Sequence, residues 1–304
     1  MSTPKDFSHA TELPANDFAE PAHQLSASLS DTPINPNNPP WSLSAAVFAW
    51  AASLILLVFV PLIAVVPYIV YQYRGADLAN LAALVQTDKT LILISIVAIL
   101  PVHLLTLAVV WMIVTGFGKR PFWQTLGWSW NGNYNFWTSA ALAVALLLFA
   151  GLITALIGEG KETDIDRIVA SSTAARITTA FLATLTAPLV EEIIYRGVLY
   201  SALQRAIGML WAIIGVSVLF AGVHVWQYSN NLGVVTAVTL LSLALTTLRA
   251  KSGRLLPCFV MHLVFNGIQS AYIVLQPLFQ PAANNSEQKT AALLSLTHAL
   301  RTLL

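Results

Sequence analysis

Two acidic residues and an arginine interrupt an apolar stretch in the second half of the chain. Glu191, Glu192 and Arg196 lie within residues 188–197, between flanks that are apolar enough to be embedded in a bilayer. Ionisable side chains at membrane depth are costly, so they are rare there and usually pair with each other or carry out chemistry. On a helix Glu192 and Arg196 are four residues apart and share a face, which predicts an ion pair. Glu191 is turned by about 100° from Glu192, so its carboxylate stays available for another role.

Two further apolar segments carry polar side chains at helical spacing. His224 follows Phe220 by four residues and Asn266 follows His262 by four residues, so each pair shares a helix face. A carboxylate and an imidazole that face one water molecule can polarise it and move its proton. A second imidazole and an amide N–H can donate hydrogen bonds to a developing oxyanion. We therefore predict amide hydrolysis by an activated water, with Glu191, His224, His262 and Asn266 as the catalytic residues.

Each of these residues also has other interpretations. Glu192 and Arg196 can form a purely structural ion pair, and a single buried histidine can simply bridge two helices. Glu191, His224 and His262 can also supply a zinc site of two histidines and one carboxylate, although the chain has no helical HExxH motif. A third hypothesis is a membrane protein without enzymatic activity: an immunity or scaffold protein, or a proton-coupled carrier. Catalysis is favoured because, within residues 177–267, every ionisable group outside the predicted loops can join one cluster.

Membrane helices must position these residues. The 304-residue chain is 57% hydrophobic and only 10% charged, whereas soluble domains have about 25% charged residues. In such spans only helices satisfy their own backbone, so the sequence predicts an all-α fold, a polytopic membrane helix bundle with about seven to eight transmembrane helices. An eighth helix arises if the first apolar run splits at Pro61 and Pro67. The runs cover residues 44–73, 90–115, 137–158, 177–203, 209–224, 232–249 and 255–276.

One predicted turn would bring an acid and a histidine together. Residues 177–203 and 209–224 form an antiparallel hairpin if the chain turns at Gly208, and Glu191 and His224 then lie at the same depth. The sequence permits a similar depth for His262 but does not require it.

Composition divides the chain into four parts. Residues 1–43 form a polar tail with seven of the fifteen prolines, and we predict that it is disordered. Residues 44–158 form the N-terminal transmembrane helices, in which we expect His103 to bond to a neighbouring helix. Residues 159–276 form the catalytic transmembrane core. Residues 277–304 form a polar linker and a short interfacial helix.

Charge and cysteine content exclude several functions. The net charge is +1 and no basic cluster indicates nucleic-acid binding. Cys258 is the only cysteine, so the chain has neither an intrachain disulfide nor a cysteine-based metal site. It lies outside the predicted cluster and is expected to be a small buried apolar residue. The connector 249–254 carries Arg249, Lys251 and Arg254 without an acid. Counted over the loops on each side of the membrane, however, the numbers of Lys and Arg residues are equal once the chain ends are included. The sequence therefore leaves the membrane orientation open.

In order and spacing, these motifs resemble those of the CPBP family of intramembrane proteases. This is the CAAX-protease and bacteriocin-processing group, also called the Abi family. The resemblance covers about residues 177–267, and it rests on Glu191-Glu192-xxx-Arg196, Phe220-xxx-His224 and His262-xxx-Asn266.

The resemblance implies a glutamic endopeptidase embedded in the membrane that uses neither a metal nor another cofactor. Glu191 would be the acid and base, His224 its partner in activating water, and His262 with Asn266 the oxyanion site. Two further residues would organise the motif, Glu192 and Arg196.

The implied partners are membrane lipid and a protein or peptide substrate, with or without an attached lipid, and the implied location is the cell membrane as a multi-pass protein. The sequence leaves open the substrate and its cleavage site, the role of residues 44–158 and the oligomeric state.

Overall fold

The computed structural model describes residues 35–75, 77, 83–84, 86–158, 160–228 and 231–279. In these ranges the chain forms helices and no strand, apart from one isolated β-bridge between Asn131 and Tyr134. The predicted all-α fold is therefore confirmed. The helices are α2 (Leu43–Gln72), α4 (Lys89–Val97), α5 (Ile99–Thr115), α6 (Phe122–Thr125), α7 (Phe136–Ile157), α8 (Asp164–Ser171), α9 (Thr173–Phe181), the π-helix η1 (Leu182–Thr186), α10 (Ala187–Glu191), the π-helix η2 (Glu192–Leu199), α11 (Tyr200–Ile207), α12 (Met209–Tyr228), α13 (Leu232–Ser252) and α14 (Leu256–Phe279).

Six continuous helical runs are long and apolar enough to cross a membrane: Leu43–Gln72, Lys89–Thr115, Phe136–Ile157, Thr173–Ile207, Leu232–Ser252 and Leu256–Phe279. The remaining predicted run, 209–224, corresponds to α12, whose apolar part Met209–Val225 is shorter. The first run does not split, because α2 continues through Pro61 and Pro67. Within the described ranges the bundle thus has six full-length apolar spans and one shorter apolar helix, rather than eight spans.

The outer surface of the bundle is apolar. On α2 alone, Phe48, Ile63 and Val70 are each more than half exposed. Large exposed apolar surfaces of this kind mark contact with a membrane or a partner. Together with the spans, they identify a multi-pass membrane protein.

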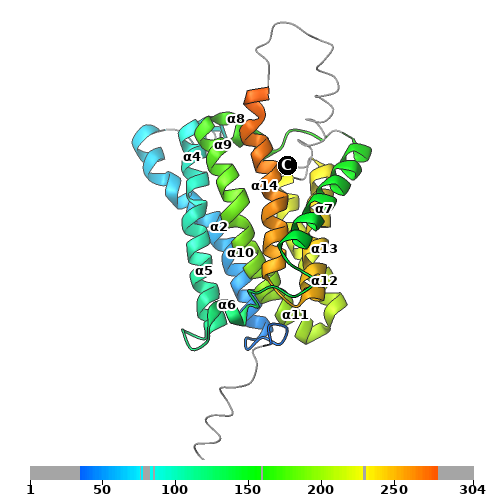
Figure 1. Ribbon diagram of the computed structural model, residues 1–304. Helices are drawn as coiled ribbons and strands as arrows, with labels where there is room; N and C mark the ends of the chain where they lie inside the picture. The colour runs from blue at the N-terminus through cyan, green and yellow to red at the C-terminus, as the bar shows by residue number, and fades with distance from the viewer. Residues whose placement is uncertain are drawn as a thin grey trace, which may run out of the picture. The chain divides into compact units, whose positions relative to one another are not determined.

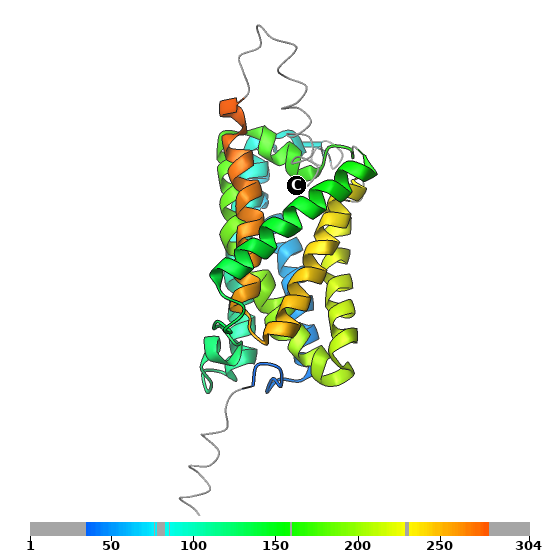
Figure 2. The same cartoon turned by 45° about the vertical axis from the view of Figure 1, so that its right-hand side comes forward.

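The long helices run alternately toward the two ends of the bundle (Figure 1). One end contains α6 and the two turns that join α11 to α12 and α13 to α14, and the other contains α8 and the start of α4. Gly208 and Gly253 cap α11 and α13 at these two turns. Both turn glycines have positive φ, 84° and 66°, a conformation that glycine adopts without steric cost. The predicted hairpin at Gly208 is present, since α11 packs against α12. Figure 2 shows α7 crossing the bundle obliquely, where it packs on α13 and α14.

The residues just before α2 are bound to the Gly208 end of the bundle. Trp41 is buried and donates its Nε1–H to the carbonyl oxygen of Val198 at 3.1 Å. Arg205 donates to the carbonyl oxygens of Pro39 and Trp41. Residues 1–34 of the predicted tail and residues 280–304 of the predicted C-terminal segment lie outside the described ranges.

Candidate active site

The two acids lie where the helix passes from α into π turns. The run Thr173–Ile207 is continuous, and the five residues of α10 are flanked by η1 and η2. At the end of η1 the Ala187 N–H donates to Leu182 O, and at the end of η2 the Tyr200 N–H donates to Tyr195 O. Both bonds span five residues instead of four. Such π turns are rare and frequently occur at functional sites.

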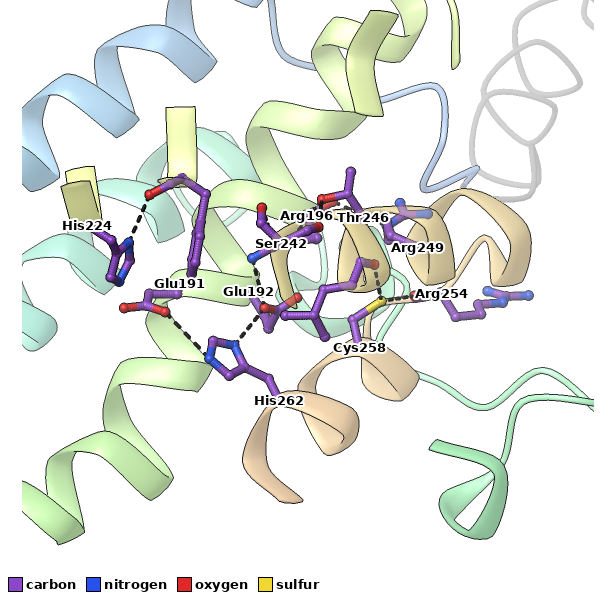
Figure 3. A network of polar contacts seen from close by, with 12 residues as sticks. Glu191, Glu192, Arg196, His224, Ser242, Thr246, Arg249, Arg254, Cys258 and His262 are labelled. Carbon is purple, nitrogen blue, oxygen red and sulfur yellow. Dashed lines mark hydrogen bonds and ion pairs between the residues drawn. The ribbon is translucent and has the colours of Figure 1, made fainter. Parts of the chain in front are cut away.

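Glu192 and Arg196 form the predicted ion pair in the interior of the bundle. Arg196 Nη1 lies 3.0 Å from Glu192 Oε1, and both side chains are fully buried. Arg196 also donates to Ser242 Oγ at 2.9 Å and to Thr246 Oγ1 at 3.2 Å, both on α13, and lies over the ring of Phe220 (Figure 3). A buried ion pair is stable only when its remaining hydrogen-bonding groups are satisfied. Arg196 meets this condition through α13, which ties η2 to that helix.

Glu192 also orients His262 of α14. His262 is buried, and its Nδ1 lies 2.9 Å from Glu192 Oε1. The carboxylate oxygen already accepts from Arg196, so it acts as an acceptor here as well and Nδ1 carries the proton. This arrangement turns Nε2 toward Glu191, whose Oε2 lies 3.8 Å away.

Glu191 has the free carboxylate that the helical spacing predicted. Its side chain is 27% exposed, and within the described ranges the carboxylate has no hydrogen-bond partner, because 3.8 Å to His262 is too long. It lines a cavity of about 410 Å³ together with His224. Figure 3 shows the carboxylate between the two imidazoles. The structure thus brings the acid and both histidines together.

His224 of α12 is held by its own helix. Its Nδ1 lies 2.8 Å from the carbonyl oxygen of Phe220, four residues back, and its ring stacks on that of Phe220 at 4.5 Å between centroids. Because a carbonyl oxygen only accepts, Nδ1 carries the proton of the neutral ring and Nε2 remains the basic nitrogen. His224 can therefore receive a proton at Nε2.

Asn266 of α14 binds the backbone of η1. Its Nδ2 donates to the carbonyl oxygen of Ala183 at 2.9 Å. In the π register that Ala187 follows, this carbonyl would accept from the N–H of residue 188, but Pro188 has no N–H. The Asn266 amide therefore takes the place of the missing backbone donor. It is not among the residues that line the cavity with Glu191.

Comparison with known proteins assigns a family to this part of the chain. Residues 173–268, from the start of α9 into α14, match the family described as type II CAAX prenyl endopeptidase Rce1-like. For this part of the chain, the match supports the CAAX protease family. The resemblance predicted from the motifs is thereby confirmed, and the chain is a CAAX-type intramembrane protease that acts on a protein or peptide substrate. No curated protein and no solved structure matches it.

The cavity of this CAAX protease has walls from outside the matched region. Ser53 and Leu57 of α2 and Ile99 and His103 of α5 line it opposite the matched helices. His103 Nδ1 lies 3.0 Å from Thr186 Oγ1 of η1, so the prediction that this histidine bonds to a neighbouring helix is confirmed. Residues 44–115 therefore help to form the compartment that contains Glu191.

Sequence reasoning missed one buried cation near the site. Arg249 appeared to belong to a connector, but α13 extends to Ser252 and Arg249 is fully buried. It donates to Arg196 O at 3.2 Å, to Asn37 Oδ1 at 2.6 Å and to Pro36 O at 3.1 Å. The only signal in the sequence was its position three residues after Thr246, on the same face of the helix.

Proposed function

We propose that this CAAX protease hydrolyses a peptide bond with a water molecule activated by Glu191 and His224. The observation that supports this most directly is the unbonded Glu191 carboxylate, which faces the cavity between two imidazoles. Each imidazole has its Nδ1 proton engaged, by Glu192 or by Phe220 O, so its Nε2 is the nitrogen left for chemistry.

The reaction follows from these assignments. Glu191 takes a proton from the water as the water oxygen attacks the substrate carbonyl carbon, while His224 Nε2 orients the water by accepting its other proton in a hydrogen bond. The oxyanion that forms accepts N–H bonds from His262 and Asn266. His262 can donate from Nε2 only when both ring nitrogens carry a proton. The C–N bond then breaks, and Glu191 returns its proton to the leaving amine.

The substrate in this proposal is a protein or peptide segment held at the membrane, with or without an attached lipid. The cavity supports this, because apolar side chains make up most of its lining. We propose the cell membrane as the location, where lipid surrounds the exposed apolar surface of the bundle.

The test uses purified full-length protein reconstituted in liposomes. The probes are internally quenched peptides ending in cysteine, two aliphatic residues and a variable residue, each with and without a farnesyl group on the cysteine. We expect cleavage by the wild type and a fall in kcat of about 10²–10⁴-fold for Glu191→Gln, the range that a general base contributes. The matched control is Glu162→Gln, an exposed acid before α8, which should leave the rate unchanged.

Three results would change the proposal. Full activity of Glu191→Gln would exclude Glu191 as the base. Loss of activity in a strong chelator, restored by zinc, would replace the glutamic mechanism with a metal-dependent one. If no probe is cleaved, mass spectrometry of membrane peptides from cells with wild type or Glu191→Ala decides whether another peptide is the substrate. Identical peptide sets would overturn the proposal.

A further inference from the structure

The end of the bundle that contains α6 is basic. Its loops and helix ends hold five surface cations that form no ion pair among the described residues: Lys119, Arg120, Arg205, Lys251 and Arg254. No described Asp or Glu lies at this end. Apart from Glu191 and Glu192 in the interior, the described acids lie at the α8 end: Asp77, Asp88, Glu162, Asp164 and Asp166. Within the described ranges, the α6 end therefore presents positive charge without a counter-ion.

Exposed tryptophans gather at the same end. Those that are more than two-fifths exposed among the described residues are Trp111, Trp123, Trp130, Trp137 and Trp211. The first lies four residues before the end of α5, the next two lie in and after α6, and the last two lie in the first turns of α7 and α12. Tryptophan is enriched where the hydrocarbon of a membrane meets the lipid headgroups. The cations of this end therefore lie at headgroup depth.

Two hydrogen bonds join the loop around α6 to the turn between α13 and α14. The Leu255 N–H donates to Gly127 O at 3.0 Å, and Asn131 Nδ2 donates to Ser252 O at 2.7 Å. Cations that are distant in the sequence thus belong to one fixed assembly, which we call the basic surface. Its members are Lys119, Arg120, Lys251 and Arg254.

The backbone beside Lys119 turns an apolar ring outward. Phe117 is the only non-glycine residue with positive φ in the described ranges, at 61°, and its side chain is about three-quarters exposed. Bulky residues rarely adopt this conformation. The Gly118 N–H supports the bend by donating to Thr115 Oγ1 at 2.8 Å. A phenylalanine ring that enters hydrocarbon, next to an ammonium group that stays among headgroups, suits a lipid surface better than a soluble acidic partner.

We propose that the basic surface binds the phosphate groups of anionic lipids. Lysine and arginine donate charge-assisted N–H bonds to phosphate oxygens, and cations next to a membrane are attracted by its anionic lipids. The exposed tryptophans hold the surface at the depth of these phosphates. Lys119 and Arg120 lie outside the region matched to the CAAX protease family, and the inference does not depend on the role proposed for Glu191.

The test measures lipid binding by the full-length protein. The protein is purified in a neutral detergent and titrated at low ionic strength with phosphatidylglycerol or phosphatidylcholine, and native mass spectrometry counts the bound lipids. Lys119→Gln with Lys251→Gln removes two exposed ammonium groups. This double variant should raise the Kd for phosphatidylglycerol about 30-fold, about fivefold for each lysine, and leave the Kd for phosphatidylcholine unchanged.

A matched control removes the same charges from the other end. Lys89 and Lys161 are also exposed, and Lys89→Gln with Lys161→Gln should change both Kd values less than twofold. Without lipid, both double variants should unfold at the temperature of the wild type. Phosphatidylglycerol should then raise this midpoint in the wild type and in the control more than in the basic-surface variant. High salt should remove the preference of the wild type for phosphatidylglycerol, because it screens exposed charges.

Equal Kd values for the two lipids in the wild type, or the same loss of binding in the control, would overturn the proposal. Displacement of phosphatidylglycerol by inorganic phosphate at a similar concentration would mean that the surface binds free phosphate instead. Tighter binding of a glutamate-rich peptide than of the lipid would indicate a protein partner and would also contradict it.

The N-terminal tail is the other candidate occupant, since it contains five acids and one lysine in residues 1–34. A full-length variant with these acids replaced by their amides tests it. If phosphatidylglycerol binds only to this variant, the tail occupies the basic surface in the intact protein and the proposal is wrong. Binding of the lipid to the wild type, lost with Lys119 and Lys251 but not with Lys89 and Lys161, supports the proposal.

Discussion

The polar network around Glu192 and the cavity wall formed by α5 and α9 differ in whether their buried polar groups have hydrogen-bond partners. Within this network, Arg196, His262 and Glu192 Oε1 have partners, whereas Glu192 Oε2 has none among the described residues. In the cavity wall, by contrast, the hydroxyls of Thr106 and Thr179 have none. Both regions lie in the same apolar bundle, and Glu191 lines the same cavity as the two threonines.

The difference indicates which of the two regions holds the site in place. A network in which nearly every polar group is bonded favours one arrangement and fixes the groups that it contains. A buried hydroxyl without a partner lowers stability. Substitutions in the network should therefore reduce stability, whereas removal of an unbonded hydroxyl from the cavity wall should not.

The largest effect is expected when the network loses a charge. Arg196→Met leaves Glu192 buried without its cation, and loss of one partner of a buried pair costs about 3–5 kcal/mol. The measurement is the free energy of unfolding in mixed detergent micelles, with Arg74→Met, an exposed arginine after α2, as the control. The double variant Glu192→Gln with Arg196→Met should recover much of the loss. A cost below about 1 kcal/mol for Arg196→Met would contradict the comparison, because the pair would then not hold η2.

A smaller effect is expected at Asn266, where two roles can be separated. Asn266→Ala leaves Ala183 O without a donor, which should cost about 1–3 kcal/mol. Adding Pro188→Ala restores a backbone N–H in this turn and should recover most of that stability. If Asn266 also donates to the oxyanion, the double variant should regain stability but keep a reduced kcat. Unfolding and peptide cleavage are therefore measured on the same preparation. Recovery of both would limit Asn266 to supporting η1 and remove it from the proposed catalytic residues.

The sequence was enough to predict the elements and the acid–histidine cluster. Four-residue spacing predicted the ion pair of Glu192 and Arg196, because neighbouring turns of a helix bring such side chains together. A glycine between two apolar runs predicted the hairpin that places Glu191 and His224 at one cavity. These features depend on local geometry and on the exclusion of charge from lipid, both of which a single sequence reveals.

Other features of the site arise from contacts between segments distant in the chain. The π turns of η1 and η2 have no clear local signature apart from Pro188, and their carbonyls are satisfied by side chains from elsewhere, such as Asn266 and Trp41. Arg249 is indistinguishable in sequence from a connector cation, because its burial depends on residues before α2. Whether Thr106 has a partner depends on its rotamer and on the cavity beside it, which the sequence does not specify.

The smallest effect tests how far the bonded network extends. Arg249 links Arg196 O to Asn37 Oδ1, so the network reaches the segment before α2. Asn37→Ala should cost about 1–2 kcal/mol of unfolding free energy, since it removes one bond to a buried cation, while kcat changes less than twofold because the bond from Arg249 to Arg196 remains. Asn38→Ala, the exposed neighbour of the same type, is the matched control and should have no effect. In a double-mutant cycle with Arg249→Met, the cost of Asn37→Ala should disappear, since its partner is already gone. If the two costs add instead, Asn37 is independent of Arg249 and the network ends at α13.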